Sequence, residues 1–452
     1  MDSVLFRRDL TDSHGGAGML RSHYIGDLKP GMSGEVRIAG WVDRVKDVGR
    51  FRFIWLRDRS GICQITVERG QGDVYDVASS LGIHDFVAIS GTVLEKPIAK
   101  VGVEIKPTRI TILSKSESPL PLDVSGLVKS GLATRLDWRP IDLRDPKNMA
   151  VLKIQAALVR GMQKYLDSSG FIQVFTPCLI GAGSEGGAEL FEVDYFGRRA
   201  YLRQDPQLHR QLLMVAGLDK IYDLGPSWRA EPSHTPRHLC EYRSCAVELS
   251  FIEDERDVMR VEEELVAAGI REVIEMCESE LRLLGVELEA PRRPFPVLEF
   301  PKVYEILEDL GKKVPWGEDL DREAEKLLAE YVKENHNHDF FFVNKFPYKV
   351  KPFYVMREDG TEWARSTDLI GGGLELSSGG QREHRYERIV QQIREKGLNL
   401  EDFKWFVEHF RYGAPPHGGF AIGIERLTMV ILGLENIREA TPFPRTPERL
   451  LP

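Results

Sequence analysis

The sequence of 452 residues has few cysteines, and they are not arranged in pairs. They are Cys63, Cys178, Cys240, Cys245 and Cys277. No two of them have the C-x-x-C spacing that is typical of a zinc or redox module. A secreted disulfide framework needs many cysteines in a small chain, so this pattern favours reduced thiols and a cytoplasmic protein.

Long apolar runs and an excess of basic charge are also missing. No stretch reaches the roughly 18 apolar residues of a membrane-spanning helix, so no membrane partner is expected. Residues 1–19 lack the apolar core of a signal peptide, and we expect them to form a mobile tail. The net charge is −9 at pH 7, so any contact with RNA must come from a local basic patch.

Two common nucleotide-binding loops are absent as well. The chain has no G-x-x-x-x-G-K-[ST] sequence, which excludes a P-loop enzyme. The segment 371–380, GGGLELSSGG, is rich in glycine but lacks the spacing of a dinucleotide-binding turn. The strand-like runs are also not separated by regular crossover helices.

Residues 20–115 have the pattern of a small β-domain. One helical segment, 74–81, accompanies five strand-like segments, which are 36–42, 51–56, 61–67, 86–94 and 103–113. Five short strands with one helix are typical of an OB-fold barrel, which often binds oligonucleotides. We therefore expect this part of the chain to bind single-stranded nucleic acid.

A linker is expected between this domain and a larger one. Residues 116–147 contain SESPLPLDVSGLV and then LDWRPIDLR, which we interpret as linker and hinge. From residue 148 to 168 apolar residues recur at helical spacing, and 258–284 is predicted to be one long amphipathic helix. The second domain is therefore expected to span 148–452, which makes the whole chain α+β.

The densest group of polar residues lies at 228–252, WRAEPSHTPRHLCEYRSCAVELSFI. Arginines in such a loop can hold phosphates or carboxylates, a glutamate can accept from an amino group, and Tyr242 can stack on a base. A solvated loop of ion pairs explains the stretch equally well. The segment 418–434, GGFAIGIERLTMVILGL, favours the first interpretation, because Arg426 in apolar surroundings needs a partner such as a phosphate.

Together these stretches resemble the class IIb aminoacyl-tRNA synthetases. WRAE with RHLCEY is similar to their motif 2, GIERL to motif 3, and GFIQVFTPCL at 170–179 to motif 1, all in the family's order. The archaeal-type aspartyl-tRNA synthetases are the most similar group, and the resemblance covers nearly the whole chain. It implies an N-terminal OB-fold β-barrel that binds the anticodon of tRNA, and a catalytic antiparallel sheet flanked by helices.

The resemblance also implies how ATP is bound. Arg229 would bridge the α-phosphate and the α-carboxylate of the amino acid, and Arg426 would hold the γ-phosphate; these two are the expected catalytic residues. The other ATP contacts that the resemblance implies are Glu231, Arg237, His238, Leu239, Tyr242, Glu375 and Gly423. Among them Glu231 would accept a hydrogen bond from the adenine amino group.

Two carboxylates seven residues apart, Asp368 and Glu375, occur in an apolar stretch where unpaired charges are costly. Oxygen donors suit Mg²⁺, whereas the alternative is an acidic strand edge that faces water; the apolar neighbours favour the metal. The family positions that match Asp368, Glu375 and Ser378 bind the Mg²⁺ that accompanies ATP.

The resemblance assigns the amino-acid pocket to Glu185, Gln204, Asp205, Gln207, Arg210, Ser378 and Arg382. The pocket departs from the family at three positions: Asp205 replaces a serine, Arg210 a lysine, and Ala246 the aspartate that holds the α-amino group. Two arginines, Arg210 and Arg382, still favour a substrate carboxylate over a neutral amide, so aspartate is the expected substrate. We expect Asp205 to make the α-amino contact that Ala246 cannot make.

The resemblance extends to RNA binding and assembly. Phe53 would stack on an anticodon base and Gln64 would read one, although strand alternation also allows Phe53 to be a core residue. The helix at 148–168, with motif 1, would form a homodimer interface or would pack as an ordinary core helix.

Three functions remain open at this point. The first is activation of L-aspartate to aspartyl-adenylate and its transfer to tRNA(Asp). The second is a paralogue with a remodelled pocket, which resists aspartyl-adenylate mimics or activates a related acid or asparagine. The third is a non-catalytic RNA-binding regulator, which is disfavoured because Arg229, Asp368, Glu375 and Arg426 are all present.

Overall fold

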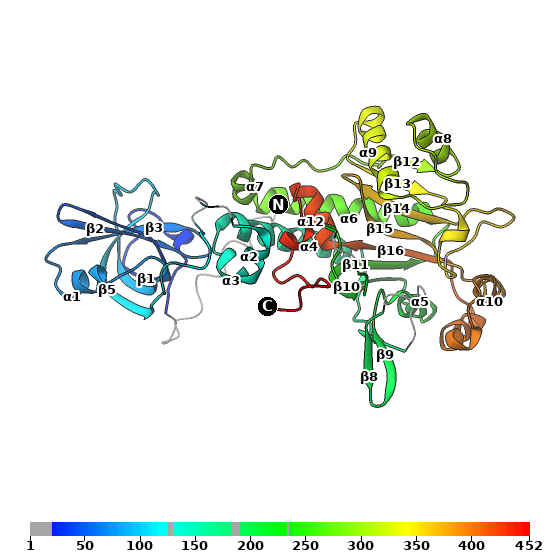
Figure 1. Ribbon diagram of the computed structural model, residues 1–452, viewed down its shortest axis with the longest axis horizontal. Helices are drawn as coiled ribbons and strands as arrows, with labels where there is room; N and C mark the ends of the chain where they lie inside the picture. Colours follow the sequence, from blue (N-terminus) through cyan, green and yellow to red (C-terminus); the bar gives the residue numbers. More distant parts are fainter. Residues whose placement is uncertain (1–19, 125–127, 129, 182–189, 233–234) are drawn as a thin grey trace. The chain divides into compact units, whose positions relative to one another are not determined.

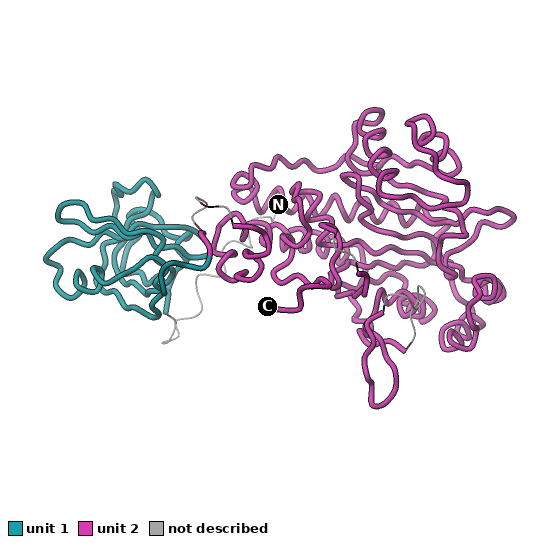
Figure 2. Tube along the Cα trace, viewed as in Figure 1, with its two compact units in different colours: residues 1–121 teal, residues 122–452 magenta. Residues whose placement is uncertain are grey.

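A computed structural model describes residues 20–124, 128, 130–181, 190–232 and 235–452. The chain divides into two compact units, the first ending at Pro121 and the second running from Leu122 to Pro452 (Figure 2). The tail expected over 1–19 lies outside the described residues. None of the described helices has the length and apolar character needed to cross a membrane.

The described part of the first unit is a closed barrel of five strands in the order β1-β2-β3-β5-β4 (Figure 1). Its elements are β1 (Glu35–Val48), β2 (Phe51–Arg57), β3 (Ile62–Glu68), α1 (Asp73–Ser79), β4 (Phe86–Val93) and β5 (Glu104–Ser114). Side chains alternate along β2, so Ile54 and Leu56 are buried in the barrel while Phe53 lies on the other face. The prediction of an OB-fold barrel is confirmed.

The second unit is built on a sheet whose strand order is β12-β13-β14-β15-β16-β11-β10-β6. These strands are β6 (Ile172–Gln173), β10 (Lys220–Trp228), β11 (Glu241–Ser250), β12 (Val297–Glu299), β13 (Phe340–Asn344), β14 (Ser366–Gly371), β15 (Leu374–Gln381) and β16 (His417–Gly423). The outermost pairs, β12 with β13 and β10 with β6, are parallel, and the pairs between them are antiparallel. The predicted antiparallel sheet is thus confirmed, with short parallel additions at its edges.

Two long helices, α4 (Pro146–Ser168) and α6 (Glu255–Met276), pack together along one face of this sheet (Figure 1). They approach closely where Gly161 of α4 meets Gly269 of α6. A Cβ atom on Gly161 would lie 2.9 Å from the Cα of Gly269, so only glycine allows this crossing. The apolar side of α4 is therefore used inside the chain, as in an ordinary core helix.

The alternation of β11 separates the core from the opposite face of the sheet. The residues that point toward α4 and α6 and share their core are Cys245, Val247 and Leu249. The even-numbered residues of the strand point to the other face, and among them are Tyr242, Ser244, Ala246 and Glu248. This second face is where the polar residues of 228–252 collect.

Two sequence-based expectations differ from the structure. The single helix predicted over 258–284 is wrong, because Cys277 (φ −124°, ψ 30°) separates α6 from α7 (Glu278–Leu284). The stretch expected as linker, 116–147, lies mostly within the second unit and forms α2 (Leu132–Asp137) and α3 (Arg139–Asp142) there. Buried Arg139 causes this docking, since it donates to three main-chain carbonyls between residues 439 and 442.

The remaining elements surround the sheet. The helices are α5 (Gln207–Val215), α8 (Lys302–Asp309), α9 (Arg322–His336), α10 (Tyr386–Glu395), α11 (Lys404–Val407) and α12 (Ile424–Leu432). A small separate sheet has the order β7-β9-β8 and consists of β7 (Leu179–Ile180), β8 (Glu192–Tyr195) and β9 (Arg198–Leu202). Since α12 begins directly after β16, Arg426 lies in the first turn of that helix, at the end of the sheet.

Candidate active site

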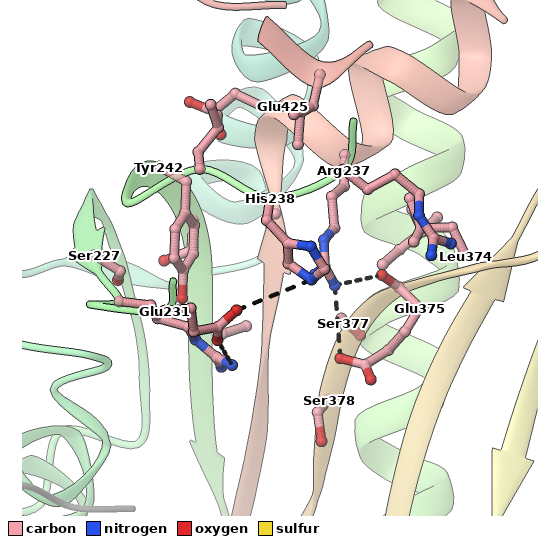
Figure 3. Close-up of a pocket in the computed structure, with 18 of the residues that line it drawn as sticks. Ser227, Glu231, Arg237, His238, Tyr242, Leu374, Glu375, Ser377, Ser378 and Glu425 are labelled. Carbon is pink, nitrogen blue, oxygen red and sulfur yellow. Dashed lines mark hydrogen bonds and ion pairs between the residues drawn. The ribbon is translucent and has the colours of Figure 1, made fainter. Parts of the chain in front are cut away.

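The sheet face that turns away from α4 and α6 carries a cavity of about 420 Å³ (Figure 3). Strands β11, β15 and β16 contribute its floor, and α9, α12 and the segment before β11 contribute its walls. The residues predicted from the sequence that line it are Asp205, Arg229, Glu231, Arg237, His238, Leu239, Tyr242, Glu375, Ser378, Gly423 and Arg426. Segments that are up to about two hundred residues apart in the sequence therefore meet at one site.

The hairpin of β10 and β11 positions the first group of these residues. The amide of Arg229 donates to the carbonyl of Cys240 at 3.0 Å, which brings both ends of the intervening loop together. Glu231 lies between two basic side chains, with Arg229 Nη1 at 3.3 Å and His238 Nε2 at 4.0 Å (Figure 3). His234, in the same loop, is outside the described residues.

Positive charge collects at the end of the cavity beside α12. Arg426 donates to the main-chain oxygen of Glu375 at 2.9 Å, and the carboxylate of Glu375 is 3.9 Å away. The pKa of Arg237 is lowered by burial and then by the charge of Arg322, and the pKa of His238 is lowered by burial and then by Arg426. Several basic side chains therefore lie close to one another at this end, which suits the binding of an anion.

The predicted metal ligands lie on two neighbouring strands. Asp368 of β14 faces Ser378 of β15, and Glu375 is near the start of β15. One oxygen of Asp368 accepts from Lys351 Nζ at 2.7 Å, while its Oδ1 is buried without a hydrogen-bond partner among the described residues. Burial raises the pKa of Asp368, and the Lys351 ammonium opposes this shift.

These groups supply only part of a metal shell. The described residues contain no cluster of three or more His, Cys, Asp or Glu side chains that could hold an ion on its own. Mg²⁺ commonly uses one or two carboxylates and takes its other ligands from phosphate and water. The open oxygen of Asp368 together with Glu375 fits that type of site.

The opposite end of the cavity closes on a buried ion pair. The two terminal nitrogens of Arg210 donate to the two oxygens of Asp205 at 2.6 and 2.7 Å, and one also donates to Gln207 at 2.7 Å. Arg210 is fully buried, so Asp205 is the member of the pair that reaches the cavity. Although burial acts to raise the pKa of Asp205, Arg210 and Arg382 hold it below its ordinary value, so Asp205 is an anion at neutral pH.

A second buried pair lies behind the first. Arg382 donates to Glu248 at 3.1 Å and to the main-chain carbonyl of Gly419 at 2.9 Å, and the side-chain Oε1 of Gln207 accepts from both arginines. Burial lowers the pKa of His417, which lies in the same network, to about 4, so its ring is neutral. Two guanidiniums are thus matched by two carboxylates, and this end is electrically balanced.

Small side chains form the floor between the two ends. The strand register aligns Ala246 of β11 with Ala421 of β16, and Ala421 with Ser378 of β15. A longer side chain at position 246 would therefore point toward the cavity that Asp205 lines. Positions 246 and 205 therefore face the same part of the cavity.

The sequence did not reveal several residues of the site. Glu248 could have been predicted, because it lies two residues after Ala246 and alternation places both on one face. Lys351 and Arg322 could not, because their segments meet the site only through the fold. Of the predicted pocket residues, Glu185 is outside the described residues. Gln204 is buried, and its side-chain Oε1 has no hydrogen-bond partner among the described residues.

The first unit has a separate candidate surface on β2 and β3. Phe53 is half-buried on the outer face of the barrel, with its ring centroid 6.1 Å from that of Phe51 and 6.5 Å from that of Trp55. Gln64 pairs with Trp55 across the two strands and donates to Thr66 at 3.3 Å. A row of aromatic side chains beside a hydrogen-bonding amide suits the stacking and reading of unpaired bases.

Comparison with known families agrees with both surfaces. Residues 131–447 match the family described as tRNA synthetases class II (D, K and N), and residues 36–113 match the OB-fold nucleic acid binding domain. Because the first match covers more than half of the chain, the chain belongs to the class II aminoacyl-tRNA synthetases. It is therefore an enzyme that joins an amino acid to tRNA, and the resemblance inferred from the three motifs is confirmed.

Within this class the chain is similar to aspartate–tRNA ligases of archaeal type. It is 47% identical to the aspartate–tRNA(Asp) ligase of Pyrococcus furiosus, over 96% of this chain and 100% of that protein. It is 44% identical to the aspartate–tRNA(Asp/Asn) ligase of Aeropyrum pernix, with the same coverage. Among solved structures it is similar to asparaginyl-tRNA synthetase from Pyrococcus horikoshii complexed with asparaginyl-adenylate (TM-score 0.89, 32% identity, 96% of this chain and 100% of that chain).

Proposed function

We propose that this enzyme activates L-aspartate with ATP to aspartyl-adenylate and transfers the aspartyl group to tRNA(Asp). The observation that carries the proposal is the pair of buried guanidiniums, Arg210 and Arg382, at the closed end of the cavity. A substrate carboxylate gains charge-assisted hydrogen bonds from them, whereas an amide gains less. The name of the Pyrococcus furiosus relative supports the same amino acid.

The proposed chemistry follows from the charges. The α-carboxylate of aspartate attacks the α-phosphorus of ATP, and pyrophosphate leaves. Both reactants are anions, so the protein has to offset their repulsion and hold them in line. In this proposal Arg229 bridges the two groups, Glu231 accepts from the adenine amino group and Tyr242 stacks on the adenine ring. The attacking carboxylate is already ionised, so no general base is required.

We assign Mg²⁺ to Asp368, Glu375 and Ser378, beside the phosphates. The ion would neutralise phosphate charge. Lys351 occupies one oxygen of Asp368 and leaves Oδ1 as the donor. Lys351 thus fixes the direction of the carboxylate, in the way that hydrogen-bonded neighbours orient metal ligands.

We assign the α-amino group of the substrate to Asp205. Asp205 is anionic and lines the cavity, but it also occupies the fork of Arg210. A substrate that brings both an ammonium and a carboxylate can replace this one internal pair with two pairs of its own, so charge stays balanced. The same pairing favours the second candidate function, a remodelled pocket for another substrate, because Arg210 cannot bind a substrate carboxylate while it is paired with Asp205.

Amino-acid-dependent pyrophosphate exchange tests these alternatives. Aspartate, asparagine, glutamate and a mixture of the other amino acids are compared at equal concentration, with ATP and magnesium. Exchange that is highest with aspartate is the expected result. Preference for asparagine or another acid would support the remodelled pocket. If none of the amino acids supports exchange, an RNA-binding regulator is favoured.

We further propose that Phe53 and Gln64 contact the anticodon and that the enzyme is a cytoplasmic homodimer. Exposed apolar residues around motif 1 support the dimer, since Phe175 is 84% exposed and Ile172 is 51% exposed. Light scattering of Phe175→Asp should report a lower mass than that of the unaltered chain. Tyr412→Asp, at another exposed aromatic residue, is the control, and an unchanged mass for both variants would contradict this interface.

A further inference from the structure

Arg322 lies at the nucleotide end of the cavity, and the proposed function gives it no role. It is the first residue of α9, and it lines the cavity together with Arg237 and Arg426. Within the part of the chain that the structure describes, it makes no hydrogen bond and no ion pair. An arginine of this kind is available to an anionic ligand in the cavity.

The backbone that carries Arg322 is held against the floor of the site. At the turn between β14 and β15, a Cβ atom on Gly373 would lie only 3.3 Å from the Cα of Lys326 in α9. One helical turn after Arg322, Glu325 lines the same cavity as Glu375 of β15. Arg322 therefore starts from a fixed point at the rim of the cavity.

The other two arginines at this end are anchored by separate elements. Arg426 is held through its hydrogen bond to the carbonyl of Glu375 at 2.9 Å. Arg237 follows Pro236, whose carbonyl accepts from the amide of Ile437 at 2.8 Å. Three arginines from three elements thus line one region of the cavity, and the backbone that carries each of them is held in place by the fold.

Two of the arginines at this end repel each other. After burial, the charge of Arg322 is the largest cause of the lowered pKa of Arg237, so these two side chains act on each other. Arg426 lines the same end of the cavity. A ligand with several negative charges would relieve the repulsion between these arginines.

We propose that Arg322 binds the β- and γ-phosphates of ATP, and the pyrophosphate that leaves, as a third arginine beside Arg237 and Arg426. This inference rests on the proposed function, because it needs ATP in this cavity. A chain of phosphates matches several spaced guanidiniums, whereas AMP has only the phosphate that lies near Arg229. Arg322 should therefore affect ligands with more than one phosphate and have little effect on AMP.

Calorimetric titration of the whole enzyme with ATP, inorganic pyrophosphate and AMP, all with magnesium, tests this prediction. In Arg322→Gln the Kd of ATP and of pyrophosphate should rise about 10-fold, the loss of one charge-assisted contact, while the Kd of AMP stays within about twofold. Arg322→Lys keeps the charge and should recover part of the affinity. Lys326→Gln is the matched control, because Lys326 is exposed on the same helix, pairs with Glu330 at 3.6 Å and does not line the cavity.

The outcomes separate this inference from the proposed function. Unchanged ATP and pyrophosphate binding in Arg322→Gln, in an enzyme that exchanges pyrophosphate with aspartate, would overturn the role of Arg322 alone. An equal loss of AMP affinity would also overturn it, because the substitution would then act through the shape of the site. An unaltered enzyme that binds neither ATP nor pyrophosphate would overturn both.

Discussion

Both ends of the cavity contain arginines, but the arginines are paired with carboxylates more closely at one end than at the other. At the amino-acid end Arg210 and Arg382 are buried, and each is bonded to a carboxylate, at 2.6 and 3.1 Å. At the nucleotide end the nearest carboxylate to Arg426 is 3.9 Å away, and Arg237 is crowded by like charge. A balanced, dry pocket admits a ligand only through exchange of partners, whereas an unbalanced, open one attracts an anion directly.

This difference agrees with the ligands that we assign. The enzyme must distinguish its amino acid from similar amino acids, and buried ion pairs penalise any ligand that leaves one of their members unpaired. ATP is common to all class II synthetases, so its site needs affinity and geometry more than selectivity. Substitutions at the two ends should therefore change different kinetic constants.

The largest effect is expected at the junction of the two ends. Arg229→Ala should reduce aspartate-dependent pyrophosphate exchange to background, a loss of at least about 100-fold, because the α-phosphate and the α-carboxylate would repel each other. Arg243→Ala is the control, since Arg243 pairs with Glu241 at 3.0 Å and does not line the cavity. Exchange within a few-fold of the unaltered enzyme would exclude the bridging role of Arg229.

The next effect is specific to the amino-acid end. Asp205→Ser should raise the KM for aspartate by about 10- to 100-fold, because the buried ammonium loses a charge-assisted bond of about 1.5–3 kcal/mol. The KM for ATP should change little. Adding Ala246→Asp should restore much of the loss, since both positions face the same space. If Asp205→Ser is neutral or improves activation, the compensation is wrong, and sulfamoyl analogues of aspartyl-adenylate would then show whether the pocket is built against such mimics.

A third substitution should leave both ends unaffected. Phe53→Ala removes one stacking surface on the barrel, so charging of tRNA should weaken by about 1–3 kcal/mol while pyrophosphate exchange stays the same. The KM for tRNA and the exchange rate are measured on one preparation, and Leu113→Ala, at another exposed barrel residue, is the control. An equal fall in exchange would mean that Phe53 has a structural role.

The smallest effect concerns the neutrality of the amino-acid end. The pKa of His417 is about 4 in the folded chain, below its ordinary value of 6.5, so the unfolded chain takes up this proton first as the pH falls. The contribution of His417 to stability is therefore complete above pH 6.5 and is lost as the pH falls toward 4. In His417→Gln the melting temperature should fall less over this window than in the unaltered chain. His336→Gln is the control, and equal slopes for all three proteins would show that His417 does not cause the loss.

Local pattern predicted the barrel, and the resemblance to the family predicted the sheet of the second unit. Alternation of apolar residues placed the strands of the barrel, and three short motifs in family order placed the sheet, the strand-to-helix junction at Arg426 and the loop at Arg229. These features were readable because each depends on residues within a few positions of one another, and strand and helix periods are local properties. The motif residues consequently line one cavity, as expected.

The partners of the charged groups were decided by tertiary structure. Arg382 bonds to Glu248, which is 134 positions away in the sequence. The pairing of Lys351 with Asp368 and the position of Arg322 depend on the packing of separate segments against one sheet. The sequence shows which charged residues are present. Strand register and burial determine which of them form ion pairs and which remain available to a ligand. That is why the two ends of this cavity, both rich in arginine in the sequence, differ in the folded enzyme.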